Sequence, residues 1–233
     1  MTEEEINRLT IGEIVARDFR AASVFREAGI DFCCGGKKGF NETCSEKGIN
    51  ASRLKEELKK LESVPNTTTH NYNEWEPVFL CDFIVNTHHK YVLKSLPELM
   101  QYTAKISEVH GDRHPELKEV AALFSEINRE LLQHLKNEEE VFFPAIREFM
   151  GTGSERSKEL IISEMKRLSA EHEFAGGAMD KINVITNKYQ LPADSCNTYR
   201  VTFKLLEQFE DDLHVHVHLE NNVLFPKIVK SIN

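Results

Sequence analysis

The most constraining feature of this chain is a motif that occurs twice. Residues 134–146 read HLKNEEEVFFPAI and residues 216–228 read HVHLENNVLFPKI, so His, Glu, Val, Phe, Pro and Ile recur at equal offsets. Residues four apart lie on one face of an α-helix, so each copy places an imidazole next to a carboxylate. The repeat therefore predicts two related helices, each carrying a histidine–glutamate pair.

Four long helical patterns follow one another after Trp75. They cover residues 76–109, 116–150, 154–188 and 194–231. Each has apolar residues at helical spacing, and the breaks between them are short. Long helices with short connections favour an up-down bundle, so we predict an all-α fold built around an up-down four-helix bundle.

The first part of the chain forms a separate predicted unit of short helices. Thr10 and Glu13 have the spacing of a capping box, Gly29 is placed as a helix-ending glycine, and Asn50 is placed as the N-cap of a further helix. The composition then becomes polar, as in a linker. We predict three segments: a small helical domain over 1–62, a linker over 63–73 and the bundle over 74–233.

Six polar side chains fall on the apolar faces of the four bundle helices. They are His89, His134, Glu138, His172, His216 and Glu220. An ionised carboxylate is costly in a core unless it is paired or bound to metal. Two metal ions would satisfy all six groups, and imidazoles together with carboxylates that can bridge favour iron. We predict two iron ions with an oxo or hydroxo bridge and a position open to a small molecule.

Other interpretations of these residues remain open. A single histidine on an apolar face is more often a hydrogen-bonded core residue, and one His-x-x-x-Glu pair is common on a solvated face. Zinc is the rival metal, although a structural zinc site usually closes with four ligands and often uses cysteine. On the first helix His88 is the alternative to His89; we choose His89 because its face carries Val85, Val92 and Leu96.

Two further acidic residues lie next to the predicted ligands. Glu130 is one turn before His134, and Glu171 is beside His172. Both are candidates for proton handling, and a solvated helix face is the alternative for each.

A second notable element is the cysteine doublet Cys33-Cys34, which is followed by two glycines. Adjacent cysteines rarely bond to each other, because disulfide geometry does not suit neighbours. We expect both thiols to be exposed and available for redox exchange or metal capture. Two buried structural thiols are the alternative.

Composition excludes several partners. The net charge is −9 and no basic stripe stands out, which argues against nucleic acid or an anionic membrane as partner. No run of about 18 apolar residues occurs, so we predict no membrane span. The start has neither the basic nor the apolar region of a signal peptide, and the cysteine count of 5 is odd. A reducing, cytoplasmic location fits these features.

Taken together, the two motifs resemble those of the iron–sulfur cluster repair di-iron proteins, the RIC family. The segment DFCCGG at 31–36 is similar to the cysteine motif of the family's N-terminal domain, and residues 216–226 are similar to the closing signature of its hemerythrin-like bundle. The family uses four His and two Glu as iron ligands. The resemblance carries these roles onto His89, His134, Glu138, His172, His216 and Glu220.

The resemblance also implies a function. It implies a cytoplasmic, often homodimeric protein that helps to restore iron–sulfur clusters damaged by oxidative or nitrosative stress, with damaged iron–sulfur proteins as its partners. Iron donation and nitric oxide removal remain open as mechanisms. One alternative is a reductase of nitric oxide or peroxide that receives electrons through Cys33 and Cys34. Another is a hemerythrin-like module that binds or senses oxygen.

Overall fold

The computed structural model describes residues 1–62 and 71–233, so most of the predicted linker lies outside the described residues. Helices dominate the described part of the chain. It contains no strand, and a single antiparallel bridge joins Thr10 to Gly39. The prediction of an all-α fold is confirmed. Within the same residues, no helix combines the length and the apolar composition that crossing a membrane requires.

The chain divides into two compact units. The amino-terminal unit consists of Met1–Leu80 together with the carboxyl-terminal segment Val217–Asn233, and the bundle unit consists of Cys81–His216. The first unit is thus built from both ends of the sequence. The second copy of the repeated motif begins at His216, so most of this copy belongs to the amino-terminal unit.

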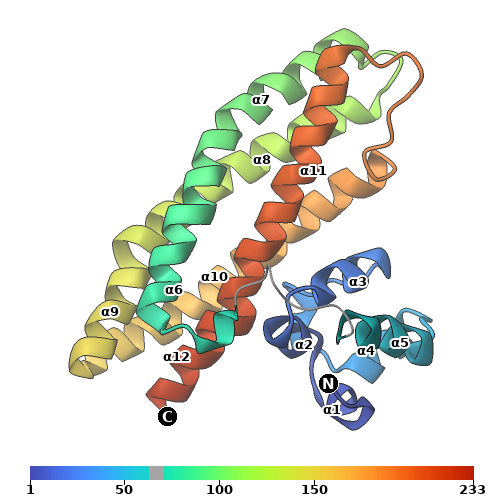
Figure 1. Cartoon of the computed structure of the whole chain (residues 1–233). Coiled ribbons are helices and arrows are strands. Elements are labelled where there is room, and N and C mark those ends of the chain that lie inside the picture. Colours follow the sequence, from blue (N-terminus) through green and yellow to red (C-terminus); the bar gives the residue numbers. More distant parts are fainter. Residues whose placement is uncertain (63–70) are drawn as a thin grey trace. The chain divides into compact units, whose positions relative to one another are not determined.

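Four long helical rods match the four predicted patterns (Figure 1). Their segments are α6 (Pro77–Ile84), η3 (Val85–His89) and α7 (Lys90–His110); α8 (Glu116–Asn137), η4 (Glu138–Phe142) and α9 (Phe143–Thr152); α10 (Glu155–Ile185); and α11 (Asn197–His218), η5 (Leu219–Leu224) and α12 (Phe225–Ile232).

Apolar stripes hold the bundle unit together. Val92, Leu96 and Leu99 of α7 are buried, as their spacing predicts. Helix α8 packs against α7 and α10, and Phe124 of α8 meets Phe209 of α11 edge to face, with ring centroids 5.4 Å apart. Burying such side chains contributes roughly 1.5–3 kcal/mol each, so the stripes are the main source of stability for the rods.

Three of the rods contain a π-helical segment that sequence reasoning missed. These segments are η3, η4 and η5. In η4 the N–H of Phe143 bonds to the carbonyl of Glu138, and in η5 the N–H of Phe225 bonds to the carbonyl of Glu220. In each of these two rods a proline follows at the start of the next α-helix, where a missing N–H costs little. Such widened turns are frequent at functional sites.

The amino-terminal unit contains short helices. They are α1 (Glu3–Arg8), α2 (Ile11–Arg17), α3 (Ala21–Glu27), η1 (Gly35–Lys37), α4 (Phe40–Glu46), α5 (Ala51–Glu62) and η2 (Tyr72–Glu74). The predicted caps are confirmed. Thr10 and Glu13 form a reciprocal capping box, Gly29 has φ +68°, and the side chain of Asn50 accepts a hydrogen bond from the N–H of Arg53 at 3.1 Å.

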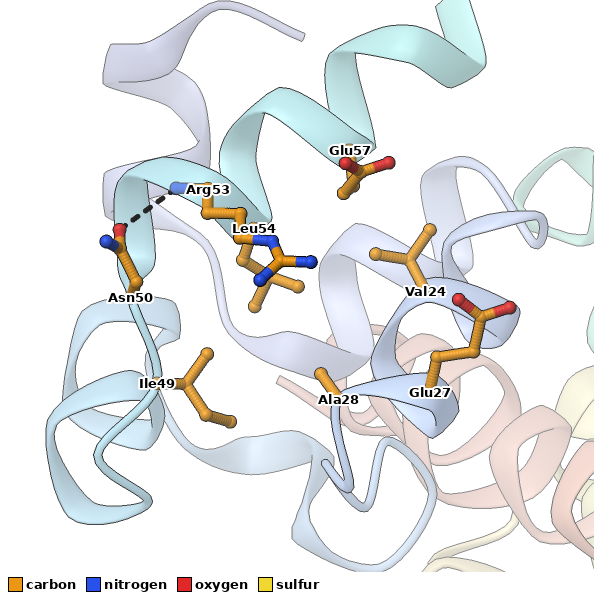
Figure 2. A pocket seen from close by; sticks show the side chains of 8 residues that line it. All are labelled: Val24, Glu27, Ala28, Ile49, Asn50, Arg53, Leu54 and Glu57. Atoms are coloured by element: carbon orange, nitrogen blue, oxygen red, sulfur yellow. Dashed lines mark hydrogen bonds between the residues drawn. The ribbon is translucent and has the colours of Figure 1, made fainter.

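A pocket of about 350 Å³ opens between α3 and the start of α5 (Figure 2). Val24, Ala28, Ile49 and Leu54 supply its apolar lining. The remaining lining residues are polar or charged: Glu27, Asn50, Arg53 and Glu57.

Candidate metal centre

Five of the six predicted ligands lie in the bundle unit, and the structure brings all five together. The ligand atoms of His89, Glu138 and His216 are within 4.8 Å of one another, and so are those of His134, Glu138 and His172. Glu138 therefore belongs to both groups. One of its oxygens, Oε2, is 3.3 Å from Nε2 of His89 and 3.3 Å from Nε2 of His134.

These five side chains are almost completely withdrawn from solvent. Glu138 and His89 are 0% exposed, and the three other histidines are at most 3% exposed. A carboxylate in such a place is costly unless cations or donors surround it. Four imidazole rings around one carboxylate form the nitrogen and oxygen donor set that suits iron or zinc. The residues present thus fit a buried metal centre.

The sixth predicted ligand, Glu220, lies on the carboxyl-terminal segment. It follows His216 by four residues on a rod in which α11 continues directly into η5. Its side chain is 0% exposed. The motif that places Glu138 beside His134 thus recurs on this rod with a second buried carboxylate.

Two carboxylates outside the cluster orient its imidazoles. Nδ1 of His89 is 2.8 Å from Oε1 of Glu139, and Nδ1 of His134 is 2.7 Å from Oε2 of Glu171. A histidine that binds metal through Nε2 commonly donates its other ring N–H to a carboxylate, which fixes the ring and the tautomer. Both hydrogen bonds thus leave Nε2 directed at Glu138.

Glu171 is itself held as an anion. Burial opposes its ionisation, but the hydrogen bond with His134 and the adjacent guanidinium of Arg167 outweigh this effect and lower the pKa of Glu171. An ionised carboxylate can only accept hydrogen bonds, so Nδ1 of His134 carries the shared proton. Glu130, the other candidate for proton handling, forms an ion pair with Arg129 at 2.8 Å, and its role stays a prediction.

The structure separates the two histidines of the doublet on the first rod. His89 enters the cluster, whereas Nδ1 of His88 is 3.0 Å from Asp212 and its ring stacks on His216 with centroids 5.6 Å apart. Both are buried, but only His89 has a ligand atom near Glu138. The choice of His89 agrees with this geometry.

The cysteine doublet is organised by an aspartate that sequence reasoning left without a role. Asp31 accepts hydrogen bonds from the N–H groups of Cys33, Cys34 and Gly35 at 2.7–3.0 Å, and from the thiol of Cys33 at 3.1 Å. The two Sγ atoms are 3.8 Å apart and form no disulfide. Ligand atoms of Asp31, Cys33 and Cys34 lie within 4.8 Å of one another.

The expectation that both thiols are exposed is wrong for Cys33. Cys33 is only 4% exposed, whereas Cys34 is half-buried. The hydrogen bond to the neighbouring thiol of Cys34, burial and the nearby carboxylate of Asp31 raise the pKa of Cys33 well above its ordinary value. Cys33 is thus a protected thiol beside a more accessible one.

Sequence reasoning also missed Glu139. On a regular α-helix, consecutive residues point about 100° apart, so Glu138 and Glu139 are not expected to serve one site. The widened turn η4 begins at this pair, and the two carboxylates contact opposite nitrogens of the same imidazole, that of His89. The run of three glutamates at 138–140 was the available signal.

Comparisons with known proteins agree with this geometry. Residues 83–228 match the family model described as "Hemerythrin HHE cation binding domain", and residues 7–62 match the model described as "Domain of Unknown function (DUF542)". The iron-sulfur cluster repair protein YtfE of Yersinia pseudotuberculosis serotype O:1b (strain IP 31758) is 32% identical over 225 residues, which cover 95% of this chain and 97% of the relative. The protein of the same name from Yersinia pestis (strain Pestoides F) gives the same identity and coverage. The match over 83–228 spans all six predicted ligands and characterises them as part of a cation-binding domain.

Proposed function

Because the chain belongs to the family of iron–sulfur cluster repair proteins that join a DUF542 domain to a hemerythrin HHE domain, we propose that it repairs iron–sulfur clusters damaged by oxidative or nitrosative stress. One observation carries the proposal: the buried carboxylate of Glu138 lies between two groups of imidazoles, each of which can hold one ion.

The proposed cofactor is a pair of iron ions with an oxo or hydroxo bridge. His89 and His216 would hold one ion, His134 and His172 would hold the other, and Glu138 would bridge them. The repeat of the motif supports Glu220 as the second bridging carboxylate. When bound, such a pair supplies a redox-active centre with a position open to nitric oxide, oxygen or peroxide.

The chain's own residues would control protons and orientation at this centre. Glu139 and Glu171 hold the imidazoles of His89 and His134 through their Nδ1 atoms, so each Nε2 is available as a ligand. Glu171 is accessible enough to exchange protons with water, because 27% of its side chain is exposed. A proton can thus reach the Nδ1 side of His134 without crossing the buried cluster.

The cysteine doublet supports a second candidate function. Two reduced thiols with Sγ atoms 3.8 Å apart can deliver electrons in a thiol-dependent reduction of nitric oxide or peroxide. Substituting both Cys33 and Cys34 by serine separates the possibilities. Reversible oxygen binding should persist without the thiols, whereas thiol-dependent reduction or repair should fail.

The proposal includes partners and a location. Damaged iron–sulfur proteins are the proposed partners, the cytoplasm is the proposed compartment, and a homodimer is the proposed assembly. Size-exclusion chromatography with light scattering tests the assembly, and a molar mass equal to that of one chain would contradict it.

The decisive experiment combines metal analysis with a repair assay. Aerobically purified protein should contain two irons per chain and show the absorption of a bridged ferric pair. Added to an iron–sulfur enzyme that peroxide or nitric oxide has inactivated, the iron-loaded protein should restore activity, and the chelated protein should not. Equal recovery of enzyme activity with the iron-loaded and the chelated protein would show that repair does not need the metal centre.

A further inference from the structure

We propose that Asn222 is a positioning residue that fastens the Cys33–Cys34 loop to the turn that carries Glu220. All of these residues belong to the amino-terminal unit. Nδ2 of Asn222 donates to the backbone carbonyl oxygens of Phe32 at 3.1 Å and of Cys33 at 3.0 Å. One amide group on η5 thus holds the peptide groups on both sides of Cys33.

Two glycines show how closely Asn222 approaches the loop and helix α2. A Cβ atom on Gly12 would lie 2.3 Å from Oδ1 of Asn222, and a Cβ atom on Gly36 would lie 2.6 Å from the same oxygen. Neither glycine has a positive φ, so backbone conformation does not require glycine at either position. Glycine inside a helix such as α2 is unfavourable relative to alanine. The room that Asn222 needs therefore accounts for both glycines.

The same face of the carboxyl-terminal rod makes a further contact with the loop. His218 lies four residues before Asn222 and is 0% exposed, and its ring centroid is 5.8 Å from that of Phe32 and 6.0 Å from that of Phe19. Nδ1 of His218 is 3.3 Å from Nδ2 of Asn222. Phe32, the residue before the cysteine doublet, is thus contacted twice: His218 packs against its ring, and Asn222 donates to its carbonyl oxygen.

This arrangement links the thiols to the metal ligand, and the link rests on the proposed function. Asn222 is two residues after Glu220 in the same widened turn, η5. If Glu220 binds iron, the metal fixes the turn η5. Because Asn222 belongs to this turn and bonds to the Cys33–Cys34 loop, the loop is fixed as well. By thermodynamic linkage, iron binding then protects Cys33, and loosening the loop weakens iron binding by the same factor.

Cysteine-specific alkylation of the full-length, iron-free protein tests the positioning role. Iodoacetamide is added under native conditions, and peptide mass spectrometry follows Cys33, Cys34 and Cys44 separately. Asn222→Asp keeps the size of the side chain but replaces the donor by an acceptor facing two carbonyl oxygens. Because two hydrogen bonds are lost, Cys33 should react about tenfold faster or more.

The other cysteines are internal controls for this experiment. Cys34 is already partly accessible and should change little, and Cys44 of α4, which is 2% exposed, reports general loosening of the unit. Asn41→Asp makes the same chemical change at an exposed pair with Asn7 and should leave all three rates unchanged. An unchanged Cys33 rate in Asn222→Asp, or an equal rise at Cys44, would overturn the proposal.

A second comparison adds ferrous iron before alkylation and tests the link itself. Iron should slow alkylation of Cys33 in the wild-type protein and should have a smaller effect in Asn222→Asp. Protection of the same size in both proteins would contradict the link through Asn222. If the wild-type protein binds no iron at all, the proposed function fails, but the comparison of the iron-free proteins still decides the positioning role.

Discussion

His134 and Glu171 form a hydrogen bond of 2.7 Å between Nδ1 and Oε2, and this bond turns the opposite nitrogen of the ring toward Glu138. Glu171 is in turn bound by Arg167. The metal-facing nitrogen of His134 is thus positioned by a chain of contacts from α10 that reaches the edge of the bundle unit.

Glu171→Gln should therefore lower the affinity for iron by about 10- to 100-fold, because the neutral amide holds the imidazole less firmly and makes it a weaker base. Iron affinity is measured by competition with a chelator of known strength. Glu173→Gln, an exposed change two residues away, is the matched control and should leave affinity unchanged. Equal affinities for wild type and Glu171→Gln would show that this hydrogen bond does not support a ligand.

Glu138→Leu should abolish iron loading and leave the iron-free protein folded. A buried charge is removed and replaced by an apolar group of similar size, so the iron-free variant should be as stable as wild type or up to about 4 kcal/mol more stable. Thermal unfolding with a chelator present measures this difference. Loss of the folded state in the iron-free variant would mean that Glu138 is needed for structure as well as for metal.

Glu210→Gln should raise the melting temperature at neutral pH. Glu210 is 6% exposed, and burial raises its pKa. A group with a raised folded-state pKa contributes stability below its unfolded pKa and loses that contribution as the pH rises through the folded pKa. Above the folded-state pKa the ionised carboxylate carries a burial cost that glutamine avoids, while the hydrogen bond from Asn183 at 2.9 Å can remain.

The gain for Glu210→Gln at pH 7 should be about 2–4 °C, which corresponds to roughly 1 kcal/mol for a chain of this size. Below about pH 4 the wild-type side chain is neutral, so the difference should disappear. Calorimetry of the two iron-free proteins across this pH range measures the difference in melting temperature. A difference that does not depend on pH would show that ionisation of Glu210 is not its cause.

Gly12→Ala should destabilise the protein by about 1–3 kcal/mol, because the new Cβ would overlap Asn222. In an Asn222→Gly background the obstacle is absent, because the Cβ of residue 222, which would lie 3.0 Å away, is removed as well. The same change should then be neutral or stabilising by up to about 1 kcal/mol, as expected for alanine inside a helix. Urea unfolding of the four proteins gives the coupling energy. Additive effects would show that Gly12 is not there to make room for Asn222.

Local patterns in the sequence predicted a large part of this structure. The capping box of Thr10 and Glu13 depends on residues three apart, and the pairing of His134 with Glu138 depends on residues four apart, so both can be derived from sequence spacing. Burial of the four rods follows from their apolar periodicity. The same periodicity selected His89 over His88.

The remaining features depend on contacts between distant residues or on departures from regular helix geometry. Asn222 reaches Cys33 across 189 positions of sequence, and no local rule predicts that contact. The role of Glu139 depends on the widened turn η4, which periodicity at 3.6 residues per turn does not reveal. Burial of Cys33 depends on how its loop is covered, and the glycines around it suggested exposure instead.

The π-helical turns have a consequence for how this centre can tolerate insertions and deletions. A widened turn holds one residue more than an α-helical turn, and each residue advances the helix by about 100°. Deleting one residue within η4 would let the rod close into an uninterrupted α-helix. His134 would keep its place, and Phe143, Ala145 and Ile146 would stay in phase with the core, but the turn that aims Glu138 and Glu139 at one imidazole would be lost. The rod beyond the centre can therefore be inherited unchanged while the ligand geometry within it is not.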